Sequence, residues 1–192
     1  MTATLSKLFA FFFTFGFAML YPQQLVPIAV PQNQNTDKVK NLIYFNPEVD
    51  PNVEEIKSVT YDSFFSAVTD RLSTMRNVKF LRAETPLSYS NTDIQTITEI
   101  CRNNNADYAV VPKVKFFKVG IGKYVLSSQV IISLKVYDAA GNYITEANYD
   151  TFRKNARILG SAENSIKIGT NGALKIIIKN FRKLNPHQQK GS

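Results

Sequence analysis

The stretch NADYAVVPKVKFFKVG, residues 105–120, decides the fold because it joins the end of one predicted helix to a predicted strand and hairpin. Successive side chains of a strand point to opposite faces, so two of its lysines fall on one side and several of its large apolar residues on the other. The first face holds Lys113, Lys115, Phe117 and Val119, and the second holds Val110, Val114 and Phe116. Pro112 cannot donate a ladder hydrogen bond, which predicts that this strand lies at a sheet edge or is bulged where it begins.

Lysines interleaved with aromatic residues on a strand have two interpretations. Single-stranded nucleic acid binds sheets that combine these residue types. Alternatively, the lysine stems of a two-sided strand lie over the edge of the sheet and prevent unwanted pairing with other chains. We favour the second interpretation, since it requires no ligand.

Apolar periodicity on both sides of this stretch predicts five strands and three helices, in the order β-α-β-α-β-β-β-α. Helices between the early strands, followed by a meander, predict an α/β domain with a single mixed β-sheet of about five strands and helices packed on it. The predicted strands span 41–48, 77–84, 107–119, 125–138 and 143–154, and the predicted helices span 52–75, 90–105 and 161–183.

Three local signals concern the predicted helices. Asn52 is the expected N-cap of the first helix, and Ser90 with Asp93 forms an expected capping box for the second. Gly169 and Gly172 each cost about 1 kcal/mol relative to alanine inside a helix, so we expect the last helix to be kinked or broken there.

Two segments of the chain carry a family resemblance. The matching positions are Ala106, Asp107, Tyr108, Val110 and Val111 in the first segment, and Val130, Leu134, Val136, Asp138, Gly141 and Ile144 in the second. Together with the helix-to-strand step FFSAVTDRLSTMRNVKFLRAE, they make residues 41–183 resemble the periplasmic domain of the CsgG, LpoB and PelC type envelope proteins. The resemblance implies a fold like the N-terminal domain of the translocation protein TolB. It also implies non-enzymatic work in a secretion channel, in an exopolysaccharide export ring or in activating a peptidoglycan synthase.

The N-terminal residues predict export. The apolar run from Leu8 to Leu20 is shorter than a typical membrane-spanning helix, and small residues precede a potential cleavage site after Ala18. We interpret residues 1–20 as a signal peptide, with an uncleaved membrane anchor as the alternative. Residues 21–40 are then a flexible tether, with a strand or docking segment at LVPIAV, residues 25–30, as the alternative. Residues 41–183 are the α/β domain and 184–192 a disordered tail. We expect a periplasmic or envelope-associated protein without a lipid anchor, because the family's lipid-attachment cysteine is missing after the apolar run.

Residue composition argues against an enzyme. A single histidine, His187, and a single cysteine, Cys101, cannot build a serine triad or a zinc site. Cys101 shares an apolar helix face with Ile94 and Ile97, so we expect a buried thiol. We therefore predict no catalytic residues, no cofactor and no metal, and leave a glycosidase that uses carboxylates from distant loops as the catalytic alternative.

Charge is distributed unevenly along the chain. Residues 37–108 contain 8 basic and 11 acidic side chains, whereas residues 109–183 contain 13 basic and 4 acidic ones. A basic half attracts anionic surfaces and acidic proteins. The candidate partner-binding surface is therefore Lys113, Lys115, Lys118 and Lys123.

Taken together, these features predict an exported module that binds or assembles other macromolecules, as an adaptor or activator of an envelope machine. The first alternative is a homo-oligomeric ring subunit of a secretion or polysaccharide-export apparatus. The second is a basic nucleic-acid-binding domain, and predicted export makes nucleic acid an unexpected partner. The expected partner is a protein of the cell envelope, a second copy of the chain or an anionic surface.

Overall fold

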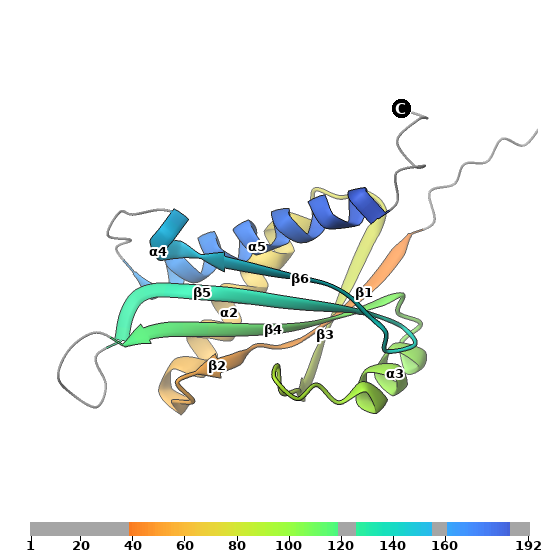
Figure 1. Ribbon diagram of the computed structural model, residues 1–192, viewed down its shortest axis with the longest axis horizontal. Coiled ribbons are helices and arrows are strands. Elements are labelled where there is room, and N and C mark those ends of the chain that lie inside the picture. Colours follow the sequence, from red (N-terminus) through yellow and green to blue (C-terminus); the bar gives the residue numbers. More distant parts are fainter. Residues whose placement is uncertain (1–38, 119–125, 155–160, 185–192) are drawn as a thin grey trace, which may run out of the picture. The chain divides into compact units, whose positions relative to one another are not determined.

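The computed structural model describes residues 39–118, 126–154 and 161–184, and it confirms an α/β fold with one mixed sheet (Figure 1). The strands are β1 (Lys40–Asn46), β2 (Glu48–Asp50), β3 (Val78–Pro86), β4 (Tyr108–Lys118), β5 (Leu126–Asp138) and β6 (Tyr143–Asp150). The helices are α2 (Glu54–Leu72), α3 (Ile94–Asn103), α4 (Thr151–Lys154) and α5 (Ala162–Leu184). The predicted leader, nearly all of the predicted tether, Lys123 and the predicted tail beyond Leu184 lie outside the described residues.

Two elements differ from the sequence prediction. The sheet has six strands, because Glu48–Asp50 forms the separate short strand β2 after Pro47. The last predicted strand ends earlier than expected, since residues 151–154 turn into α4. There the Oγ1 atom of Thr151 accepts the N–H of Val130 at 2.9 Å and donates to the Val130 carbonyl at 2.8 Å, which ties the end of β6 to β5.

Strand β4 lies in the interior of the sheet, so the predicted edge position is wrong, and so is the interpretation that its lysines lie over a sheet edge. The predicted bulge near its start is not found either, since its pairing with β5 shifts register only between Phe116 and Lys118. The order is β3-β1-β4-β5-β6, with β3, β1 and β4 parallel and β4, β5 and β6 antiparallel. Residues 108–110 of β4 pair with β1, and residues 113–115 pair with β2. Pro112 falls between these two pairings, where the ladder is already interrupted and its missing N–H costs little.

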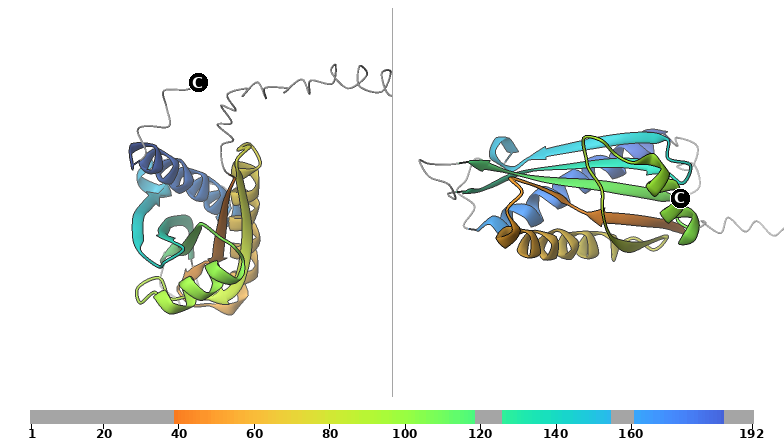
Figure 2. Two further views of the ribbon diagram at one scale, coloured as in Figure 1. Left: turned by 90° about the vertical axis from the view of Figure 1, so that its right-hand side faces the viewer. Right: turned by 90° about the horizontal axis from the view of Figure 1, so that it is seen from below.

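Helices cover the two faces of the sheet unequally (Figure 2). On one face, α2 and α5 pack against the sheet in a first core that includes Phe64, Val114 and Leu174. On the other face, α3 packs over a smaller second core that includes Phe45, Ile97 and Cys101. The expectation that Cys101 is a buried thiol is confirmed.

The first residues of the NADYAVV stretch end helix α3 and then bond the start of β4 to β1. Asn105 has a φ of 50°, and the N–H groups of Ala106 and Asn105 donate to the carbonyls of Cys101 and Arg102. This is the Schellman arrangement that ends a helix, with asparagine in place of the usual glycine. Asp107 then accepts the N–H of Asn41 at 2.9 Å and donates its own N–H to the Asn41 carbonyl at 2.8 Å, which aligns β4 with β1.

Both predicted N-caps need correction. Helix α2 begins after Val53 rather than Asn52, and no side chain caps it, because a tight turn from the Val53 N–H to the Pro51 carbonyl sets its start. Helix α3 is capped by Asp93 alone, whose carboxylate accepts the N–H of Gln95 at 3.0 Å. Ser90 takes no part in this cap, since it lies before the helix start.

The predicted break in the last helix is also wrong, since α5 continues through both glycines. Instead, these glycines allow the helix to approach the sheet closely. A Cβ atom on Gly169 would lie 2.5 Å from Cγ1 of Ile132 and 3.2 Å from Cγ2 of Thr151, and one on Gly172 would overlap the Tyr149 ring. Both glycines are therefore required by packing rather than by backbone conformation.

We expect Gly169→Ala to destabilise the fold, although alanine is the better helix former. Ile132 and Thr151 are fully buried and cannot move aside, so overpacking should lower the free energy of unfolding by about 1–3 kcal/mol. Asn164→Ala, at an exposed position of the same helix, is the control and should change stability by about 0.5 kcal/mol or less. Urea unfolding of both variants tests this, and a stabilised Gly169→Ala protein would contradict it.

Candidate functional site

Part of the second face of the sheet is not covered by any described helix. Helix α3 has 10 residues and is about 15 Å long, whereas β4 has 11 residues and extends over about 36 Å. Ala109 and Val111 lie under α3 in the second core, but Lys113 and Lys115 on the same face lie beyond it. Residues of four strands form this uncovered region, which we call the open face: Glu48, Asp50, Lys113, Lys115, Ile131, Ser133, Lys135, Glu146, Asn148 and Asp150.

Glu48 is held in place on the open face by two donors from different parts of the chain. Its Oε1 accepts from Lys113 Nζ at 2.7 Å, and its Oε2 accepts from the backbone N–H of Tyr89 at 2.8 Å. Burial alone would raise the pKa of this carboxyl group. The two hydrogen bonds and the charge of Lys113 outweigh burial, so the pKa of Glu48 lies below its ordinary value.

Tyr89 connects the loop before α3 to the far side of the open face. Its hydroxyl donates to Oε1 of Glu146 at 2.7 Å, and its carbonyl accepts from Lys135 Nζ at 2.7 Å. The same ammonium group lies 4.4 Å from the centre of the Tyr89 ring. Burial and the Glu146 carboxylate raise the pKa of Tyr89 far above its ordinary value, so the hydroxyl remains a neutral donor.

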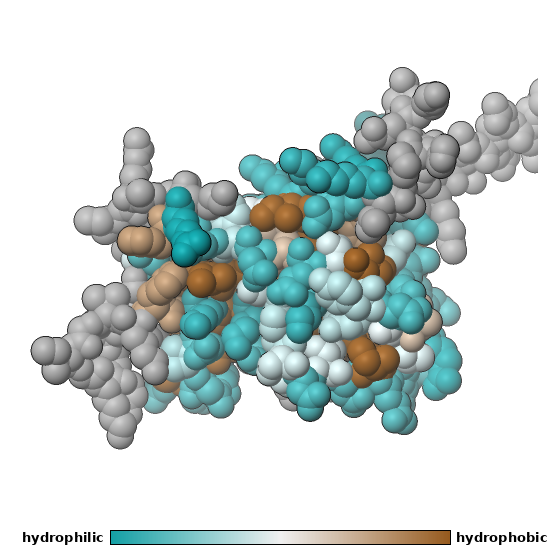
Figure 3. All heavy atoms as spheres, viewed as in Figure 1, coloured by the Kyte–Doolittle hydropathy of each residue, from teal (hydrophilic) through white to brown (hydrophobic). Residues whose placement is uncertain are grey.

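Aromatic side chains lie at the end of the open face next to α4. Phe117 follows Lys115 by two positions on β4, and its ring centre lies 6.4 Å from that of Phe152. Phe152 is 57% exposed, the highest value among the large hydrophobic side chains described. Figure 3, drawn from the same side as Figure 1, shows apolar residues gathered beside α4 and hydrophilic residues over the middle of the face.

The candidate lysines predicted from the sequence have different surroundings. Lys113 is half-buried in its ion pair with Glu48, and Lys115 is exposed between its strand partners Asp50 and Ile131. Lys118 ends β4, and its side chain lies outside the described residues, as does all of Lys123.

The acidic residues beside these lysines were missed in the sequence prediction. The short strand EVD, residues 48–50, places Glu48 and Asp50 beside Lys113 and Lys115 of the KVK stretch. A matching alternation of acidic and basic residues, 65 positions apart, is the signal that could have indicated this pairing. The open face therefore carries both charges, even though the C-terminal half of the chain is basic overall.

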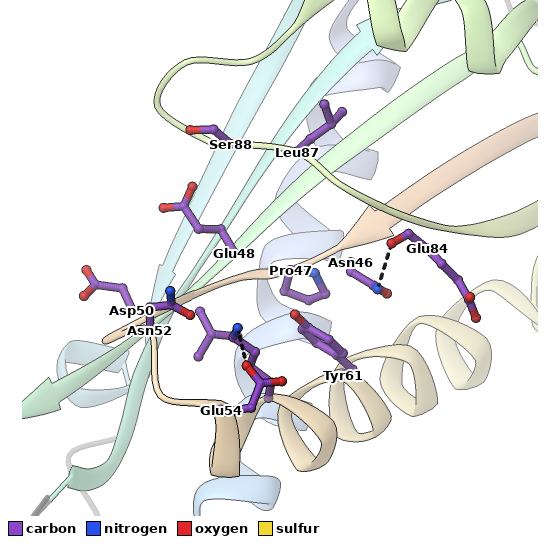
Figure 4. Close-up of a pocket in the computed structure, with 12 residues that line it drawn as sticks. Asn46, Pro47, Glu48, Asp50, Asn52, Glu54, Tyr61, Glu84, Leu87 and Ser88 are labelled. Atoms are coloured by element: carbon purple, nitrogen blue, oxygen red, sulfur yellow. Dashed lines mark hydrogen bonds and ion pairs between the residues drawn. The ribbon is translucent and has the colours of Figure 1, made fainter.

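A cavity of about 680 Å³ borders the open face along the outer edge of β2 (Figure 4). Figure 4 shows Tyr61 and Glu54 of α2 on one side of it, and Leu87 and Ser88 of the loop after β3 on the other. The cavity is lined by Asn46, Pro47, Glu48, Val49, Asp50, Asn52, Glu54, Lys57, Tyr61, Glu84, Leu87 and Ser88.

No group of three histidine, cysteine or carboxylate side chains that could hold a metal ion is present among the residues described. Burial raises the pKa of the Cys101 thiol, which makes it a poor nucleophile. In residues 39–118, 126–154 and 161–184, no helix has both the length and the apolar character needed to cross a bilayer.

Comparison with solved structures finds similar folds at low identity. A PelC dodecamer from Paraburkholderia phytofirmans matches with a TM-score of 0.41 and 10% identity, over 74% of this chain and 86% of that one. A neuraminyllactose-binding hemagglutinin homolog from Helicobacter pylori matches with 0.39 and 11%, over 78% and 86%. Lipoprotein GNA1162 from Neisseria meningitidis matches with 0.35 and 10%, over 76% and 99%.

PelC is also one of the proteins that the sequence resembles. No protein-family model and no curated protein sequence matches the chain. At these identities and TM-scores the likeness concerns the fold, and the role of the chain is argued below from its own residues.

We expect Lys113→Met to raise the pKa of Glu48, as measured by NMR titration of its side-chain carboxyl carbon. A carboxyl group whose pKa is lower in the folded state adds stability above its unfolded pKa and loses it as pH falls through the folded value. The variant should therefore lose less unfolding free energy than the parent protein between about pH 7 and pH 3. Lys57→Met, which removes an ion pair with Glu54 instead, should leave the Glu48 titration unchanged. An unaltered Glu48 pKa in Lys113→Met would contradict the pairing.

Proposed function

We propose that this chain is an exported, non-enzymatic envelope protein that binds a partner protein through the open face. The observation that carries the proposal is a sheet face half covered by α3 and half left uncovered, with its charged side chains held in fixed positions. Groups that are already ordered lose little conformational freedom on binding, which favours affinity.

Mixed charge on the open face favours a protein partner over nucleic acid. Lys113 and Lys115 have carboxylates from β2 as neighbours. Another carboxylate, Asp150 of β6, pairs with Ile131 of β5, which is itself the strand partner of Lys115. A phosphate backbone would meet these carboxylates as well as the lysines and would be repelled by them. A protein surface can instead present both charges in a complementary pattern.

The aromatic end of the open face has the chemistry of an interface anchor. Phe117 and Phe152 contact each other, and the exposed Phe152 ring is available to a pocket on a partner. Aromatic side chains surrounded by polar groups are the residues that contribute most to many protein interfaces. Lys115 lies two positions from Phe117 and provides a free charge beside this anchor.

The envelope as the site of action is supported by the sequence. The N-terminal apolar run has the length and the small residues of a secretory signal, and the resemblance covers residues 41–183. The proposed location is the periplasm, as an adaptor or activator within an envelope assembly.

We expect the double variant Lys115→Glu/Phe152→Ser to capture its partner from envelope extract at least about fivefold less than the parent chain, because it loses both anchor and charge. The matched control is Lys175→Glu/Val59→Ser, which makes the same chemical changes at exposed positions of α5 and α2. Captured proteins are quantified by mass spectrometry, and equal capture by both variants would overturn the proposed contact surface. Light scattering on the same samples identifies the partner as a second copy if only the parent chain and the control form oligomers.

A further inference from the structure

The outer edge of β2 is an open strand edge that faces a cavity. Among the described residues, β2 pairs with β4 on one side and with no strand on the other. Strand β3, which flanks β1, pairs only as far as Asn46 and Pro86, so the position beside β2 is vacant. The backbone N–H and C=O groups along such an edge can pair with another strand.

The cavity beside this edge is lined by both apolar and acidic residues. Pro47, Val49, Tyr61 and Leu87 supply apolar surface to its lining. Four carboxylates and one ammonium group also line it, and that ammonium, from Lys57, is already paired with Glu54 at 2.6 Å.

Two of the carboxylates are available to a ligand. Glu48 is occupied by Lys113 and the N–H of Tyr89. In the described part of the chain, the side chains of Asp50 and Glu84 take part in no ion pair. The negative charge of the cavity is therefore not neutralised by the protein itself.

We propose that an extended, basic segment of a partner protein binds in this cavity by adding as a strand along the outer edge of β2. Backbone hydrogen bonds to β2 would supply affinity, and alternate side chains would supply specificity, as in other cases of strand addition. A strand added about 4.8 Å from β2 would occupy the place that β3 leaves vacant.

The pairing on the inner side of β2 indicates which sequence would fit the outer side. There, Glu48, Val49 and Asp50 have Lys113, Val114 and Lys115 as neighbours, so basic residues meet acidic ones and valine meets valine. Because strand neighbours share a face, a segment on the outer side would place basic residues beside Glu48 and Asp50, near Glu84. Its intervening apolar residue would lie beside Val49 and face the first core. The segment expected is basic-apolar-basic.

The inference goes beyond the proposed function and does not depend on it. The two sites share Glu48 and Asp50, but the open face otherwise presents side chains of β4, β5 and β6. This site uses the backbone edge of β2 together with residues of α2 and of the end of β3. Variants at Lys115 and Phe152 test the first surface, and variants at Asp50 and Glu84 test the second.

The experiment uses the full chain and a fluorescently labelled, end-capped peptide of sequence Val-Lys-Val-Lys-Val, titrated at low ionic strength and followed by anisotropy. We expect saturable binding, no binding of the matching Val-Glu-Val-Glu-Val peptide, and affinity reduced about fivefold or more in Asp50→Asn/Glu84→Gln. Glu99→Gln, on the exposed side of α3, should bind as the parent chain does. No binding of the lysine peptide, or equal binding by the double variant, would overturn the inference.

Peptides with N-methylated backbone amides distinguish strand addition from simple charge attraction. A strand uses the N–H groups of alternate residues toward its neighbour, so methylating one alternate set should abolish binding while methylating the other set should spare it. Equal binding of both methylated peptides would show attraction to the acidic residues alone and would overturn strand addition. A second copy of the chain could occupy the site instead of another protein. If peptide binding weakens as the chain forms dimers, which light scattering detects, the occupant is that second copy and the proposal is overturned.

Discussion

The pairing of β4 with two different parallel neighbours is the constraint on which the rest of the structure depends. Asp107 and Asn41 fix the start of β4 against β1 through two hydrogen bonds, one between backbone groups and one from the Asn41 N–H to the Asp107 carboxylate. This sets the register for all eleven residues of the strand. Val110 is thereby assigned to the first core and Val111 to the second. Beside β1, helices cover both faces of β4. Beside β2, the described helices cover only one face of it.

The fold was largely predictable because its elements carry local signals. Apolar alternation in β5 and the asparagines after α3 are visible in the sequence without knowledge of neighbours. Pro112 and the two glycines of α5 were misjudged for one reason, since their roles depend on residues far away in the chain. Pro112 lies where the neighbouring strand changes from β1 to β2. The glycines lie against the side chains of Ile132 and Tyr149. Local propensity cannot contain such information.

The candidate site was less predictable, since charge summed along the chain does not describe charge on a surface. Lys113 was selected because its half of the chain is basic, yet its nearest charged neighbour comes from the acidic half. Strand β2 has three residues, too few for an apolar period, so its acidic alternation was the one local signal of its pairing. The folded register shows that it pairs Glu48 with one lysine and leaves Asp50 beside another. The surface that results carries both charges rather than the uniform positive charge that the sum along the chain suggested.

Because Cys101 is buried, its reactivity can be used to measure the local opening of α3. This thiol is the only one in the sequence, and in the folded protein it lies under α3 with no solvent exposure. A water-soluble thiol reagent can therefore reach it only when α3 opens away from the sheet, and the labelling rate under native conditions measures the free energy of that opening. Tyr89 lies in the loop before α3 and bonds Glu146 and Lys135 of the open face, so this reaction would report on the stability of the segment that borders that face.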